Sequence, residues 1–242
     1  DRIGRALSLE GDTLDRFIEV WRSEERGPRA IDAMFDDLDL GAAVPDHLAR
    51  QRTRMRNVAV HERHSIGPGR SMQRCEMSRV VEVLAPGLDR FVWLTDIDTD
   101  VDADKLVASR LYNCEVGATH VLAGGRVKCF EFMFGRAPAV GDRHGFGYSI
   151  DYEAARTGES PAPVAETEVL MGLWVSSVSL SLQVDFAPGA VPKDVRRVEQ
   201  PTLDATTANA SAVELSAFRV AGITIDHPGP GVYGLRWDWP DD

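Results

Sequence analysis

The chain has 242 residues, a length that suits one large domain or an ordinary domain with an appendage. Its 27 Lys and Arg against 38 Asp and Glu give a formal net charge of −11, which excludes nucleic-acid binding through the bulk surface, because phosphates require clustered cations. The three cysteines cannot all pair and none lies in a C-x-x-C spacing, which favours free thiols in a reducing cytoplasm. No apolar run approaches the roughly 18–20 residues of a membrane span, and the opening residues lack an apolar signal core. We therefore expect a cytoplasmic protein with no membrane partner.

The first 45 residues show the period of helices. Apolar residues in 2–22 recur mostly at spacings of three and four, which is typical of a helix that packs on one side. Asp12 or Thr13 is a good N-cap for a helix that runs to about residue 25. A weaker helical pattern covers 30–40 and ends at 41–45. These patterns predict two or three short helices that form a connector, residues 1–45.

Beyond about residue 50 the period changes to two. In 179–186, leucine, valine and phenylalanine alternate with polar residues, which indicates a half-buried strand of an antiparallel sheet. The alternation recurs in 127–134 and 232–239, and further strand-like runs cover 72–84, 90–95, 111–116, 144–151, 168–175, 195–199 and 223–226. Roughly ten short strands without intervening helices predict a mainly β fold, an antiparallel β-sandwich over 46–242, with long loops at 157–165 and 200–212.

Four arginines alternate just after the predicted connector: Arg50, Arg52, Arg54 and Arg56. On a strand, their guanidinium groups would line one face and could contact phosphates or an acidic partner. The alternative is an exposed strand whose charge is neutralised by nearby acids such as Asp36, Asp37 and Asp39. The second interpretation fits the negative net charge better, but the arginines are the best anion-contact patch in the sequence.

No metal site is expected. The run DIDTDVDAD (Asp96 to Asp104) begins like a calcium loop but lacks the glycine and the terminal glutamate of that motif, so we expect a solvated acidic loop, with a weak cation site as the alternative. His61 and His64 stand three apart in HERH, in a segment that we interpret as a strand, where they would point to opposite faces. No cysteine or carboxylate stands at a zinc-motif spacing from them.

The sequence also lacks the familiar catalytic templates, including the G-x-S-x-G elbow and the glycine-rich phosphate loops. Cys75 and Cys129 fall within strand patterns and are expected to be small core residues. A catalytic triad of serine, histidine and aspartate that only the fold brings together stays open as an alternative. We therefore predict no enzyme and no cofactor.

Aromatic residues alternate on several of the predicted strands. They are either core residues or the lining of an apolar pocket between the sheets. The residues concerned are Phe130, Phe132, Trp174, Tyr233, Trp237 and Trp239.

Three segments resemble parts of bacterial regulators of the Cro/repressor (XRE) type. The opening DRIGRALSLEGDTLDRFIEVWRSEE is similar to the end of their helix-turn-helix domain, while VVEVLAPGLDRFVWLTDID and the final VYGLRWDWP resemble the β-rich region that follows it. Arg236, Trp237 and Trp239 match that ending, and Asp238 replaces the usual glutamate. The resemblance implies the effector region of a transcriptional regulator, whose DNA contact lies upstream of residue 1.

Such a region would bind a small molecule, a protein effector or its own copy. We expect a homodimer held by the predicted helices at 2–25 and 30–40, because their apolar stripe needs another surface. Two alternatives from other classes stay open: a small-molecule enzyme with a pocket in the β-sandwich, and a plain protein-interaction module.

Overall fold

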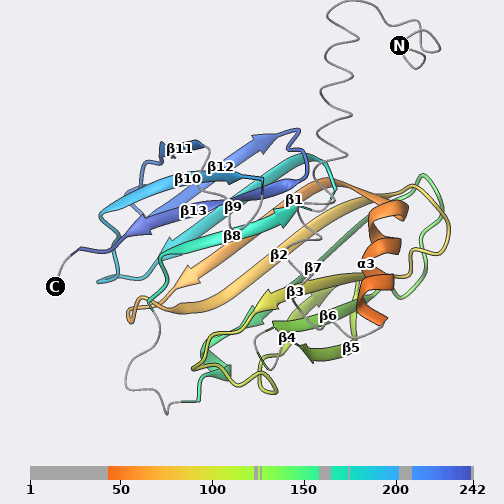
Figure 1. The fold of residues 1–242 in the computed structure, drawn as a ribbon, viewed down its shortest axis with the longest axis horizontal. Coiled ribbons are helices and arrows are strands. Elements are labelled where there is room, and N and C mark those ends of the chain that lie inside the picture. The colour runs from red at the N-terminus through yellow and green to blue at the C-terminus, as the bar shows by residue number, and fades with distance from the viewer. Residues whose placement is uncertain are drawn as a thin grey trace, which may run out of the picture.

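The computed structural model describes residues 43–122, 125, 127–157, 165–173, 175–201 and 209–240 (Figure 1). The helices expected over 2–25 and 30–40, and the dimer contact assigned to them, lie outside these residues. The division of the chain near residue 45 stays a prediction. Among the described helices, none is long and apolar enough to cross a membrane.

Most of the described chain is β-structure in three sheets, which confirms the mainly β, sandwich-like fold class. The largest sheet has the order β12 (Val220–Asp226), β9 (Ser177–Phe186), β1 (Met55–Ile66), β2 (Met72–Val83), β7 (Arg143–Asp151) and β4 (Ala108–Tyr112). The four-stranded sheet has the order β11 (Asn209–Ala212), β10 (Asp194–Gln200), β13 (Gly231–Asp238) and β8 (Glu168–Leu173). The three-stranded sheet has the order β3 (Arg90–Asp96), β6 (Val127–Met133) and β5 (Glu115–Leu122).

The two smaller sheets pack on different parts of the largest one (Figure 1). Phe132 of β6 stacks on Tyr148 of β7, with ring centroids 3.8 Å apart. Trp237 of β13 meets Phe186 of β9 edge-on at 5.1 Å. One buried cluster includes all four rings, so the sheets share a single hydrophobic core.

Neighbouring strands are antiparallel, as expected, except for one pair. β1 runs parallel to β9, with Glu62 opposite Leu182 and His64 opposite Val184. On its other side β1 forms a hairpin with β2. The hairpin turns at Gly67 to Ser71, a segment with two glycines and a proline, and Gly67 donates its backbone N–H to Ser71 O at 2.9 Å.

Helix α3 (Ala43–Arg54), orange in Figure 1, corrects the prediction that Arg50, Arg52 and Arg54 line one face of a strand. Residues two apart on a helix are about 200° apart around its axis, so these arginines do not share a face. Pro45 falls in the first turn of α3, where a missing backbone N–H costs nothing. The end of the helix predicted over 30–40 lies outside the described residues.

Two smaller predictions also fail. The strand expected over 111–116 is broken between β4 and β5, where Asn113 takes a positive φ of 50°. The loop expected over 200–212 contains β11, which pairs with β10. The short 3₁₀ turn η2 (Glu153–Ala155) follows β7.

Candidate functional site

A cleft of about 590 Å³ opens where all three sheets and α3 meet. Its floor comes from β1 and β2, and its walls come from α3, β3 and β8. This volume falls in the range of small-molecule sites in proteins. The cleft is therefore the best-formed candidate for a binding site among the described residues.

Three buried polar residues meet at the floor. Glu62 and His64 are two apart on β1, so both point to the inner face, and Cys75 of β2 stands directly opposite His64 in the hairpin register. His64 Nε2 lies 2.8 Å from Glu62 Oε1, and Cys75 Sγ lies 3.7 Å from the same oxygen. Glu62 and His64 line the cleft, whereas Cys75 is buried and is not part of its lining.

Several buried polar atoms of this floor have no hydrogen-bond partner among the described residues. They are Glu62 Oε2, His64 Nδ1 and Arg79 Nε. The side chains of Glu62 and His64 are only 6% and 8% exposed. An unsatisfied polar atom at such depth costs about 1–3 kcal/mol, so a bound group that supplies partners would relieve that cost.

Arg79 occupies the floor beside the acidic group without pairing to it directly. Its NH1 donates to Asn57 Oδ1 at 3.2 Å, and its guanidinium lies 4.5 Å from the centroid of the Phe91 ring. Burial lowers the pKa of Arg79, although nearby Glu62 acts in the opposite direction. Arg79 therefore places a positive charge on the floor, close enough to Glu62 to interact with it.

Two carboxyl groups share one wall of the cleft. Asp98 follows β3, Glu166 precedes β8, and the two groups are hydrogen-bonded to each other. Burial, followed by the charge of Asp98, raises the pKa of Glu166 to about 8, and burial also raises the pKa of Asp98. Two carboxyl groups in this arrangement share a proton at neutral pH.

Behind this wall, buried Asp100 pairs with Arg156. The guanidinium also donates from NH2 to Met72 O at 2.8 Å. The acidic run is therefore not the solvated loop that the sequence predicted, because Asp100 belongs to the interior and Asp98 to the cleft.

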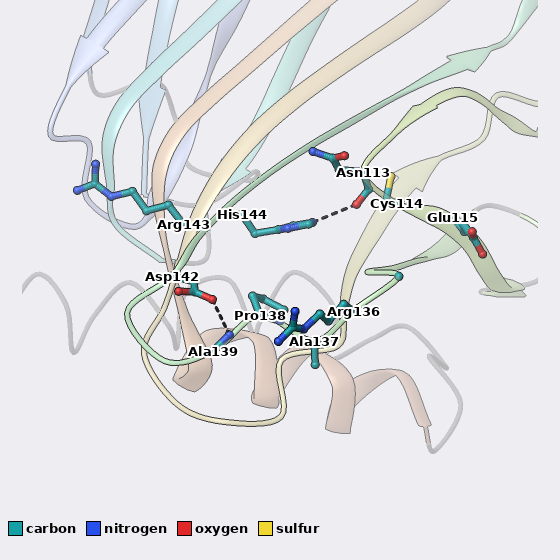
Figure 2. Close-up of a pocket in the computed structure, with 11 residues that line it drawn as sticks. Asn113, Cys114, Glu115, Arg136, Ala137, Pro138, Ala139, Asp142, Arg143 and His144 are labelled. Carbon is teal, nitrogen blue, oxygen red and sulfur yellow. Dashed lines mark hydrogen bonds between the residues drawn. The ribbon is translucent and has the colours of Figure 1, made fainter.

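A second hollow of about 700 Å³ lies at the ends of β5 and β7 (Figure 2). In Figure 2, His144 points to Asn113, and its Nε2 lies 3.0 Å from Asn113 O. Asp142 accepts the backbone N–H of Ala139 at 2.9 Å. Arg136 and Arg143, which line this hollow, are exposed, so water already solvates the two guanidinium groups. This hollow is therefore the weaker candidate for a binding site.

The four arginines do not form one patch. Arg50 is exposed, Arg52 lines the cleft, Arg54 NH1 donates to Gly87 O at 2.8 Å, and Arg56 pairs with Glu82 at 2.9 Å. The predicted common face is therefore wrong.

The predicted aromatic residues lie in the core and do not line the cleft. Phe130, Phe132, Tyr233 and Trp237 are buried, and Trp239 is half-buried beside them. Trp174 lies outside the described residues. The cleft takes its aromatic lining from Phe91, Trp93 and Tyr152 instead.

Sequence reasoning missed the residues that make this site. His61 and His64 do lie on opposite faces, as expected, but the partners of His64 are Glu62 and Cys75. Two features of the sequence could have indicated this group. Glu62 and His64 alternate on one strand, and a hairpin that turns at Gly67 to Ser71 places Cys75 opposite His64.

No protein-family model and no curated protein match this chain. Among solved structures, a protein described as a candidate protease from Parabacteroides distasonis is 8% identical, with a TM-score of 0.47 over 76% of this chain and 40% of the other. An M1 zinc metallopeptidase from Deinococcus radiodurans is 10% identical, with a TM-score of 0.39 over 76% of this chain and 42% of the other. The chain thus spans about 40% of the length of these structures.

The prediction of a regulator's effector region is corrected by this result. The solved structures reported above are named as a candidate protease and as an M1 zinc metallopeptidase, and not as regulators. The likeness assigns no activity to this chain, and the function is argued from the cleft alone.

Proposed function

We propose that this β-rich chain is a binding domain that holds a small organic cation, an amine with an apolar portion, in the cleft. The observation that carries the proposal is the set of buried polar atoms on the cleft floor that lack partners, above all Glu62 Oε2. A polar group of a ligand would complete their hydrogen bonds.

The charge of the lining selects a cation. Five carboxyl groups line the cleft (Glu62, Asp96, Asp98, Glu166, Glu168) against two guanidinium groups, Arg52 and Arg79. Of the five, Glu168 is already paired with Arg236. An ammonium group beside Asp98 and Glu166 would take the place of their shared proton and relieve the repulsion between the two carboxylates. Complementary charge in a partly buried site favours the matching ligand over its anionic analogue.

The apolar lining selects the rest of the ligand. Met55, Phe91, Trp93 and Met171 line the same cleft from three directions. A hydrocarbon or aromatic portion would bury surface against them, worth about 25 cal/mol for each Å² removed from water. An arylalkyl amine fits both parts of the lining.

Binding without catalysis is part of the proposal. Burial raises the pKa of the Cys75 thiol well above its ordinary value, and the neighbouring Glu62 raises it further, so the thiol is protonated and a poor nucleophile. The three cysteines are free thiols, which supports a reducing compartment, and we place the protein in the cytoplasm on that basis.

The test is calorimetric titration with a matched ligand series: 2-phenylethylamine and longer arylalkyl amines, with 2-phenylethanol and 3-phenylpropionate as neutral and anionic analogues. We expect the amines to bind at least tenfold more tightly than either analogue. Glu166→Gln and Asp98→Asn should remove that preference, whereas Asp142→Asn in the second hollow should leave it intact. Equal binding of amine and carboxylate, or an unchanged preference in Glu166→Gln, would overturn the proposal, as would failure of every amine to bind.

A further inference from the structure

We propose that Glu62, His64 and Cys75 form a binding site for one transition-metal ion of the zinc class. The three residues each offer one ligand atom, and these atoms lie within 4.8 Å of one another. All three residues are buried. The site goes beyond the proposed amine binding and does not depend on it.

The separations between the ligand atoms suit a tetrahedral ion. The observed distances are 2.8 Å from His64 Nε2 to Glu62 Oε1, 3.7 Å from Cys75 Sγ to Glu62 Oε1, and 4.0 Å from Cys75 Sγ to His64 Nε2. Tetrahedral zinc with ordinary bond lengths separates a nitrogen and an oxygen ligand by about 3.3 Å, and sulfur from either by about 3.6 Å. Side-chain shifts of a few tenths of an ångström bring the three atoms to those values.

Hydrogen bonds alone satisfy this group poorly. A thiol S–H and an imidazole N–H both reach the same oxygen, Glu62 Oε1, while Glu62 Oε2 and His64 Nδ1 have no partner among the described residues. The residues paired with the group on the neighbouring strands are apolar: Leu182 lies opposite Glu62, Val184 opposite His64, and Ile150 opposite Cys75. Arg79 lies on the same floor, but its guanidinium donates to Asn57 and not to Glu62. A buried carboxylate in such surroundings needs a compensating charge.

A divalent ion supplies that charge, and its two positive charges equal the negative charges of its ligands. Cys75 loses its proton to solvent and binds as thiolate, Glu62 binds as carboxylate and His64 as neutral imidazole, so the bound group is neutral overall. A thiolate with an imidazole and one carboxylate selects zinc, cobalt or copper over magnesium and calcium. Since Glu62 and His64 line the cleft, the fourth coordination position faces the cleft, where water or another donor can reach it.

Cobalt(II) provides the direct test, because a thiolate ligand gives a charge-transfer band in the near ultraviolet and a four-coordinate ion gives visible bands. Reduced protein titrated with cobalt(II) under argon should develop both bands at one equivalent, and zinc should bleach them. Cys75→Ser should lose the thiolate band, while Cys129→Ser, a buried thiol on β6, should keep it. Circular dichroism checks that each variant is folded.

Glu62→Gln keeps the size of the side chain and provides a second test of the same site. We expect zinc affinity to fall by more than the roughly 10–100-fold that loss of an outer-shell partner costs. Zinc should raise the melting temperature of the parent protein and not that of Cys75→Ser. Absence of a thiolate band at one equivalent of cobalt, or a band that persists in Cys75→Ser, would overturn the metal site. Amine titrations in the presence of a chelator test the proposed function separately.

Discussion

The side chain of Gln51 pairs with both backbone polar groups of Val92. Val92 N–H donates to Gln51 Oε1 at 2.7 Å, and Gln51 Nε2 donates to Val92 O at 3.4 Å. Strand β3 is an edge of the three-stranded sheet, so a helix side chain takes the place of the missing neighbouring strand. This contact attaches α3 to the sheet and fixes one wall of the cleft.

We expect Gln51→Ala to lower the free energy of unfolding by about 1–3 kcal/mol, because it leaves the buried Val92 N–H without a partner. Urea denaturation measures the change. Arg50→Ala is the control, since Arg50 is an exposed residue of the same helix, and it should change stability by no more than about 0.5 kcal/mol. Equal effects of the two substitutions would contradict the role of this contact.

The pair Arg156–Asp100 is a second source of stability. Its side chains are 11% and 5% exposed, so Arg156→Met leaves a buried carboxylate without its partner, at a cost of about 3–5 kcal/mol in the free energy of unfolding. The exposed pair Arg196–Asp238 provides a comparison, and Arg196→Met should cost at most about 1 kcal/mol. Similar losses for both variants in urea denaturation would be inconsistent with this assignment.

Gly234 permits the close pairing of β13 and β8. A Cβ atom added there would lie 2.2 Å from Val169 O, which belongs to the partner strand's backbone and cannot move aside cheaply. We expect Gly234→Ala to destabilise the protein by at least about 2 kcal/mol. Gly145→Ala on β7 is the control, because its Cβ would meet only Val80 Cγ2 at 3.8 Å. Thermal denaturation of both variants should show a large loss only for Gly234→Ala.

The pair Asp98–Glu166 makes stability depend on pH. The pKa of Glu166 is raised to about 8 in the folded protein, so the folded state holds a proton that the unfolded state releases from about pH 4.5 upward. The contribution of Glu166 to the free energy of unfolding is therefore fully present below about pH 4.5 and is lost as the pH rises through 8.

Glutamine cannot ionise, so Glu166→Gln lacks the loss of stability that the parent shows at high pH. We therefore expect the melting temperature of Glu166→Gln minus that of the parent to increase as the pH rises from 5 to 9. The exposed Glu115→Gln should track the parent throughout. A difference that stays constant with pH would refute the shared proton. The same proton must leave before an amine binds, so amine affinity should rise over this pH interval.

The three thiols should be protected from modification. All three cysteines are buried, and burial together with the Glu131 charge raises the pKa of Cys129 to about 12. We expect a disulfide reagent at pH 7 to react with none of them until denaturant unfolds the chain, since only the thiolate attacks. Rapid reaction of one equivalent in native buffer would disagree with this structure.

The strands were the most predictable part of the fold. Alternation of apolar and polar residues in β9 follows directly from a sheet with one buried face, and the structure confirms it. β13 is a strand as predicted, but residues 231–235 are all buried, so it lacks the single buried face that the alternation indicated. α3 was missed because Pro45 and the alternating arginines favour other structures locally, whereas packing of Leu48 against Val92 and Cys129 stabilises the helix.

The site was less predictable because it is assembled by pairing between distant residues. Glu62 and His64 alternate on one strand, but only the register with β2 brings Cys75 to them. Asp98 and Glu166 approach because β3 and β8 belong to different sheets that border one cleft. Single-sequence periodicity contains no information on that arrangement, which depends on tertiary packing.

The parallel pairing of β1 with β9 has a consequence for how the molecule folds. The hairpin of β1 and β2 can form from neighbouring residues, but β1 gains its second partner only when a strand from much later in the chain arrives beside it. Closing so long a loop is slow relative to hairpin formation. The strand that carries Glu62 and His64 therefore stays half-paired until late in folding, and a metal ion or ligand at the cleft would be captured only in the final steps.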